Sequence, residues 1–141
     1  MKYLLTAIIL LFSPEIRAAE PYTLDNWHLL DGDTIVAERL NLPFGVCLTD
    51  VTMRMADYDA WETSFRRTTV NVTNEEIKKG KAAAKDLNEL LKNNPFRVLP
   101  GDTDKPRDVY GRLLVKIEVN LPEKGWIKIA DWMKEKGHCR E

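Results

Sequence analysis

Apolar and polar residues alternate along residues 22–40, and the alternation is interrupted at Asp31-Gly32-Asp33. An Asp-Gly step between two apolar-rich runs is a strong hairpin signal, because the turn positions favour residues that tolerate positive φ. A third run, rich in Val, Leu, Thr and Met, follows a turn that a proline and a glycine indicate. The pattern therefore predicts three strands, over residues 24–30, 34–40 and 46–57.

After these strands, the spacing of apolar residues changes to that of an α-helix. Thr73-Asn74-Glu75-Glu76 has the form of a capping box, with threonine at the cap and glutamate three residues later. We expect a helix over residues 74–93, with lysines on one face and an apolar stripe on the other, formed by Ile77, Ala84, Leu87 and Leu91. Strands are predicted at residues 96–99 and 113–119. A last short helix is predicted from the stripe formed by Trp126, Ile129, Ala130 and Met133.

Five short strands with a helix between the third and the fourth are the element order of the OB-fold, a small and partly open barrel that often binds oligonucleotides. The predicted class is α+β and mainly β, with one short C-terminal helix. The chain has 141 residues, 44% of them hydrophobic and 30% charged. This composition is typical of one soluble domain and excludes a collagen, a disordered tail and a multi-span membrane protein.

Residues 1–19 have the parts of a secretory signal peptide: a lysine, an apolar run and small residues before the expected cleavage point. The apolar run is too short for a membrane span, which needs about 20 residues. We predict a leader over residues 1–19 and an OB-fold domain over residues 20–141, exported to the periplasm or secreted, with no membrane attachment after cleavage. The alternative is an uncleaved anchor or a buried core helix.

The charges balance, with 21 Lys and Arg against 22 Asp and Glu. A net charge of −1 provides no general attraction for a polyanion, so a nucleic acid would have to meet a local basic patch. Such a patch is predicted from basic residues around the helix, namely Arg66, Arg67, Lys78, Lys79, Lys81 and Lys85. The alternative is that these lysines form an ordinary solvated helix face.

The chain has two cysteines, Cys47 and Cys139. In an oxidising compartment a pair of this kind persists as a disulfide, and we favour that bridge over two free thiols. Neither the spacing of the cysteines nor the two histidines of the chain indicates a zinc site.

Acidic residues gather at two predicted strand ends. Asp31 and Asp33 lie in the first hairpin turn, and Asp57, Asp59 and Glu62 follow the third strand. If these strands are neighbours, the carboxylates converge as a hard cation such as Ca²⁺ or Mg²⁺ requires. The alternative is ordinary turn chemistry and solvated acids, with an ion pair between Arg54 and Asp59.

Four segments, in this order along the chain, resemble the staphylococcal nuclease (thermonuclease) family. These segments are Asp31-Gly32-Asp33-Thr34, Arg54-Met55-Ala56-Asp57-Tyr58-Asp59-Ala60-Trp61-Glu62, Lys79-Gly80-Lys81-Ala82-Ala83-Ala84 and Asp108-Val109-Tyr110-Gly111-Arg112. The resemblance extends from about Leu29 to Gly137, which is most of the chain after the predicted leader. The resemblance implies calcium as the cofactor. It identifies Asp33 and Asp59 as carboxylate ligands of the ion and Ala60 as the source of a backbone carbonyl ligand.

The same resemblance implies the catalytic residues. Glu62 corresponds to the glutamate that positions or deprotonates the attacking water, and Arg54 and Arg112 correspond to the arginines that contact the scissile phosphate. Arginine suits this task because its planar donors bind two phosphate oxygens together. A cation and two such groups stabilise the charge that develops in the transition state.

The sequence departs from the family pattern at three places. Trp61 stands where the family has proline, and it is interpreted either as a base-stacking residue or as a lid on the barrel end. Val109 stands where the family commonly has lysine. The family continues with a loop and a final helix beyond the segment that matches residues 126–137, and this helix is expected to be absent here. Tyr110 and Trp61 are the expected substrate contacts.

The sequence therefore predicts an exported, calcium-dependent nuclease that hydrolyses DNA and RNA with little sequence preference and leaves 3′-phosphate ends. We expect single-stranded substrate to be favoured and the protein to be a monomer. Two alternatives from other classes remain: a non-catalytic OB-fold module that binds single strands, and a protein-interaction scaffold without nucleic-acid affinity.

Overall fold

A computed structural model gives the fold and describes residues 21–64, 72–101 and 104–140. Within these residues six strands form one sheet, with the hydrogen-bonded order β1-β2-β3-β5-β4 and with β6 paired to β5. The strands are β1 (Thr23–Leu29), β2 (Thr34–Asn41), β3 (Cys47–Met55), β4 (Phe96–Pro100), β5 (Leu113–Leu121) and β6 (Gly125–Lys128). The other elements are a 3-10 turn, η2 (Pro43–Gly45), and the helices α2 (Asn74–Asn93) and α3 (Ile129–Glu135).

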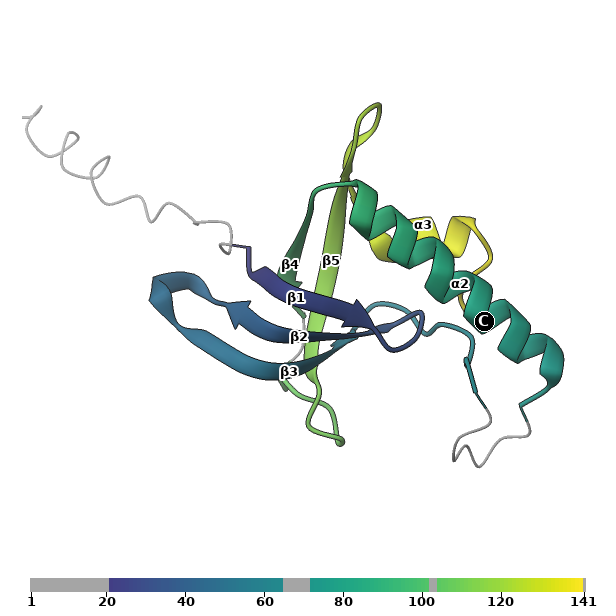
Figure 1. The fold of residues 1–141 in the computed structure, drawn as a ribbon, viewed down its shortest axis with the longest axis horizontal. Helices are drawn as coiled ribbons and strands as arrows, with labels where there is room; N and C mark the ends of the chain where they lie inside the picture. The colour runs from purple at the N-terminus through teal and green to yellow at the C-terminus, as the bar shows by residue number, and fades with distance from the viewer. Residues whose placement is uncertain (1–20, 65–71, 102–103, 141) are drawn as a thin grey trace, which may run out of the picture.

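The sheet curls into half of a barrel, and α2 and α3 lie together beside it (Figure 1). Strands β1, β2 and β3 form an antiparallel meander, whereas β3 pairs with β5 in parallel. The two outer strands approach each other where Tyr22, just before β1, pairs with Val98 of β4. The backbone N–H of Tyr22 donates to the Val98 carbonyl at 2.7 Å. The predicted class, α+β and mainly strands, is confirmed.

The predicted hairpin is present between β1 and β2. Its turn is closed by a hydrogen bond from the Leu30 N–H to the Thr34 carbonyl, at 2.9 Å. Inside the turn the Asp33 N–H donates to Oδ1 of Asp31 at 3.1 Å. This side-chain acceptor is the reason that aspartate is favoured in such turns.

The predicted helix and its capping box are confirmed as α2. The Glu76 N–H donates to Oγ1 of Thr73 at 3.2 Å, and the Thr73 N–H donates to Oε2 of Glu76 at 2.8 Å. The predicted apolar stripe was wrong at one position, because Ala84 is only half-buried. The buried face of α2 instead consists of Ile77, Gly80, Ala83, Leu87 and Leu91.

The end of the fold differs from the prediction. Trp126 was expected on the last helix but lies on β6, which returns antiparallel to β5 with Asn120 opposite Trp126. Gly125 has a φ of +69°, which allows the chain to reverse before β6. The Trp126 ring packs beneath the Arg97 guanidinium, whose central carbon lies 4.4 Å from the ring centroid. The helix α3 begins only at Ile129, so the sheet gains a sixth strand.

The expected disulfide is not formed, and both cysteines are free. Cys47 is the first residue of β3, and Cys139 pairs with Ala60, which follows the other end of that strand. Nine residues of extended chain separate the ends of β3 by about 26 Å, whereas a disulfide needs Cα atoms within about 7 Å.

The core joins the strands to both helices. Its fully buried side chains include Ile35 and Met53 of the meander, Ile117 of β5, Leu87 of α2 and Met133 of α3. In the described part of the chain, no helix combines the length and apolar character needed to cross a membrane. The predicted leader and the pair Arg66 and Arg67 lie outside the described residues.

Candidate functional site

A polar pocket of about 260 Å³ opens where the first hairpin turn, the end of β3 and the chain before β5 meet. It is lined by Asp31, Asp33, Arg54, Asp59, Ala60, Trp61, Glu62, Arg112 and Arg140. A larger hollow of about 560 Å³ lies between β1, the end of α2 and the start of β4. Among the described residues that line it, Lys92 is the single charged one, so it offers few groups for acid–base or metal chemistry. The polar pocket is therefore the candidate for chemistry.

Asp33 lies at the centre of the polar pocket and is 5% exposed. Its Oδ2 accepts a hydrogen bond from the Ala60 N–H at 2.9 Å, and its Oδ1 accepts one from Oγ1 of Thr34 at 3.1 Å. The Arg54 guanidinium forms an ion pair with the same carboxylate. A buried carboxylate needs partners of this kind, so the geometry of Asp33 is set from three segments of the chain.

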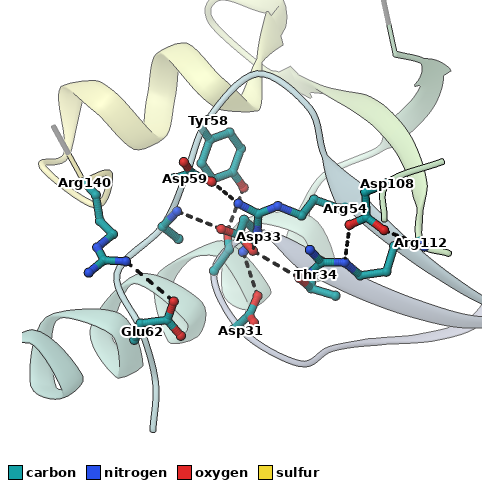
Figure 2. A network of polar contacts seen from close by, with 12 residues as sticks. Asp31, Asp33, Thr34, Arg54, Tyr58, Asp59, Glu62, Asp108, Arg112 and Arg140 are labelled. Carbon is teal, nitrogen blue, oxygen red and sulfur yellow. Dashed lines mark hydrogen bonds and ion pairs between the residues drawn. The ribbon is translucent and has the colours of Figure 1, made fainter. Parts of the chain in front are cut away.

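Arg54 lies on β3 directly opposite Thr34 of β2. One of its terminal nitrogens contacts Asp33 and the other contacts Asp59, so a single guanidinium bridges the two carboxylates (Figure 2). The two acids are distant in sequence but share one cationic partner. They therefore converge on one small volume.

Asp31 adds negative charge beside this centre. Burial, together with the negative charge of Asp33, raises the pKa of the Asp31 carboxyl to about 6. The neighbouring Tyr58 hydroxyl donates to the Gly32 carbonyl at 2.7 Å, and burial together with the charge of Asp33 raises the pKa of Tyr58 well above its usual range. Because several carboxylates lie close together, a nearby positive charge would stabilise their ionised forms.

Arg112 enters the polar pocket from a tight turn before β5. Oδ1 of Asp108 accepts hydrogen bonds from the N–H groups of Tyr110 and Arg112, both at 2.9 Å, and its Oδ2 accepts one from Nε of Arg112 at 2.6 Å. Burial alone would raise the pKa of the Asp108 carboxyl, but the hydrogen bonds from Arg112 lower it. Nη1 of Arg112 also lies 3.4 Å from Oγ1 of Thr34. Arg112 is thus held by Asp108 and directed into the pocket.

Glu62 lies on the segment that follows β3, which we call the acidic loop (residues 57–62). Two glycines allow close contacts with this loop. A Cβ atom on Gly32 would lie 2.6 Å from the Cβ of Ala60, and one on Gly80 of α2 would lie 2.6 Å from the Trp61 carbonyl oxygen and would overlap the Glu62 carbonyl. The backbone of Trp61 and Glu62 therefore packs directly against Gly80 of α2.

This contact predicts an unusual sign for Gly80→Ala. In an exposed helix, alanine is favoured over glycine by about 1 kcal/mol. At Gly80 we expect destabilisation of about 1–3 kcal/mol instead, because the added methyl group must displace the backbone of the acidic loop. Urea denaturation measures this change. Ala82→Gly, at an exposed position of the same helix, is the control and should destabilise by about 1 kcal/mol; a more stable Gly80→Ala protein would contradict the contact.

Trp61 is held by contacts within the protein. Its indole N–H donates to the Gly137 carbonyl at 3.3 Å, and the Lys79 ammonium lies 5.0 Å from its ring centroid. Lys79 also pairs with Glu75 at 3.4 Å. These contacts support the interpretation of Trp61 as a residue that covers the barrel end.

The polar pocket contains oxygen donors of the kind that a hard cation such as Ca²⁺ takes. In the described residues, no three Asp, Glu, His or Cys side chains are grouped as a ready-made metal cluster. Asp33 and Asp59 nevertheless present oxygens to one cationic centre, and Ala60 adjoins them in the lining. Ca²⁺ accepts carboxylates together with backbone carbonyls and water, so these residues fit that ion.

The structure brings together most of the residues that the sequence singled out. Those that line the polar pocket are Asp31, Asp33, Arg54, Asp59, Ala60, Trp61, Glu62 and Arg112. Tyr110 is outside the lining and 81% exposed, with the Arg112 guanidinium carbon 5.5 Å from its ring centroid.

Sequence reasoning missed Arg140, which enters the lining from the far end of the chain and has no motif around it. It also missed Asp108 as the partner of Arg112, although an aspartate three residues before a turn glycine is a usable signal of a turn that its side chain stabilises.

Comparison of the chain with protein-family models and with curated proteins gave no match. A function for the chain therefore has to be argued from the polar pocket: its carboxylates, its arginines and the backbone that holds them.

Proposed function

We propose that this chain is a calcium-dependent nuclease of the thermonuclease type, which hydrolyses DNA and RNA with little sequence preference and leaves 3′-phosphate ends. The observation that carries the proposal is the convergence of Asp33, Asp59 and Glu62 with Arg54 and Arg112 on one open pocket. The proposal includes the finer fold assignment, an OB-fold barrel. The curled sheet and the position of α2 between β3 and β4 support it. It also includes export through residues 1–19.

The arginines suit a phosphodiester. Hydrolysis forms a bond from water oxygen to phosphorus and breaks the bond from phosphorus to the 5′ oxygen, which leaves with a proton. Negative charge increases on the phosphoryl oxygens in the transition state, and guanidinium groups aimed there bind it more tightly than the ground state. Arg112 is already oriented by Asp108, so it loses little freedom when a phosphate binds.

Asp33, Asp59 and the backbone of Ala60 would hold the cation. When bound, Ca²⁺ supplies a Lewis acid for the phosphoryl oxygen and offsets the charge of the carboxylates. Arg54 exchanges at least one of its two carboxylate partners for a phosphate oxygen when substrate is bound. Glu62, 38% exposed at the edge of the pocket, accepts the proton of the attacking water.

A second function is favoured by one observation. Arg54 already pairs with both Asp33 and Asp59, so these two carboxylates have a cationic partner within the protein itself. Such a pocket suits a non-catalytic OB-fold module that binds single strands.

Calcium removal tests the proposal. We expect the mature protein to cleave a fluorescent single-stranded oligonucleotide with calcium, and a chelator to lower the rate by at least about 100-fold, because several kcal/mol of transition-state stabilisation are lost. Re-addition of calcium should restore the rate, and phosphatase treatment of the products should reveal 3′-phosphate ends. Binding without cleavage would support the binding module, and neither activity would support a protein-interaction scaffold.

A further inference from the structure

The segment after α3 runs along the acidic loop. We call residues 137–140 the tail segment. Cys139 forms a β-bridge with Ala60, and the Arg140 N–H donates to the Asp59 carbonyl at 2.9 Å. The Trp61 indole adds its hydrogen bond to the Gly137 carbonyl. The tail segment therefore holds the loop that carries Asp59 and Glu62 by backbone pairing, across about 80 residues of sequence.

The Arg140 side chain extends from this pairing into the polar pocket. Its Nη1 lies 3.6 Å from Oε1 of Glu62, and its Nη2 lies 3.8 Å from Oε1 of Glu76. Figure 2 shows Arg140 and Glu62 facing each other, on the opposite side of Asp33 from Arg112. Arg140 is thus the arginine of the pocket that faces Glu62, whereas Arg54 and Arg112 contact other acids.

Glu76 provides a fixed anchor for this arginine. It belongs to the capping box of α2, where its carboxylate accepts the Thr73 N–H. That backbone hydrogen bond lowers the pKa of the Glu76 carboxyl and keeps it charged. Arg140 therefore spans a carboxylate that the helix cap fixes and a carboxylate on the loop.

We propose that Arg140 is a positioning residue, which holds the Glu62 carboxylate in the orientation needed to accept the proton of the attacking water. This inference rests on the proposed nuclease function and deepens it. Arg140 acts through Glu62 and not through the phosphate, because its guanidinium lies between Glu62 and Glu76, on the side of Asp33 away from Arg112. No motif in the sequence assigns it this task.

A double-mutant cycle separates the positioning role from phosphate binding. We expect Arg140→Ala to lower kcat by about 10- to 100-fold, less than complete loss of a general base, with KM changed by less than about twofold. Arg140→Lys should recover part of the loss. In a Glu62→Gln background, Arg140→Ala should have no further effect beyond about twofold. Equal losses in both backgrounds, or a raised KM, would overturn the proposal in favour of a phosphate contact.

A readout without catalysis makes the test independent of turnover. The ¹³Cδ resonance of Glu62, assigned through Glu62→Gln, should shift in Arg140→Ala and shift less in Arg140→Lys. Arg39→Ala, an exposed arginine on β2, is the matched control and should leave the resonance and kcat unchanged. An unmoved resonance in Arg140→Ala would overturn the contact itself. A shifted resonance in a chain whose wild type cleaves nothing would overturn the nuclease function and the positioning role, while the contact between the two side chains would stand.

Discussion

Glu62→Gln is expected to lower the rate of calcium-dependent cleavage by about 10² to 10⁴, the usual contribution of a general base. The amide keeps the size of the side chain but cannot accept a proton from water. Binding should survive, because Glu62 is removed from the Asp33 and Asp59 carboxylates that converge on Arg54. Single-turnover cleavage of an oligonucleotide measures the rate, and fluorescence anisotropy with a chelator measures the affinity.

Glu89→Gln is the matched control for this variant. Glu89 is an exposed carboxylate on α2, 4.0 Å from Lys85 and outside the polar pocket. It should leave both rate and affinity unchanged. A Glu62→Gln protein that cleaves at the wild-type rate would exclude Glu62 as the base.

Arg112→Ala is expected to lower kcat/KM by about 10² to 10³, the typical loss when one donor to transition-state charge is removed. The expected effect is large because Arg112 is already oriented before substrate binds: it enters the pocket from the turn before β5, with Asp108 holding its Nε at 2.6 Å. Steady-state kinetics on the same oligonucleotide measure the loss.

Arg112→Lys should restore only part of the rate, since an ammonium group cannot bind two phosphate oxygens as a planar fork does. Arg39→Ala again controls for the loss of one positive charge. If Arg112→Ala and Arg39→Ala lowered the rate equally, Arg112 would act through net charge alone and would not contact the scissile phosphate.

Local patterns were sufficient for most of the fold. The Asp-Gly turn, the capping box and the alternation of apolar residues are each produced by neighbours in sequence, and the corresponding hairpin and helix are present. The prediction that Trp126 belongs to the last helix was wrong, because the spacing of Trp126 and Ile129 fits either a helix or the end of a hairpin. Gly125, with its positive φ, determines that the chain reverses into β6.

The site was predictable only in part. Asp33, Arg54 and Asp59 stand in local motifs, and the register that places Thr34 opposite Arg54 brings them together. The pairing of Cys139 with Ala60 left no local signal, so the partner of Cys139 was misassigned to Cys47 and the contribution of Arg140 was missed. Contacts between segments so far apart follow from the packing of α3, which sequence periodicity does not encode.

Fraying of the first turns of α2 is expected to be an early step in the heat inactivation of the protein. The capping box anchors Arg140 through Glu76, and Gly80 supports the backbone of the acidic loop. Helix ends open before the core of a domain does, and segments joined to them open as one cooperative unit. Partial unfolding that begins at Thr73 would therefore remove the Glu76 anchor of Arg140 and the support that Gly80 gives to the acidic loop, while the sheet is still intact. Activity should be lost at a temperature below that at which the sheet melts. A weaker helix cap should widen the difference between these two temperatures.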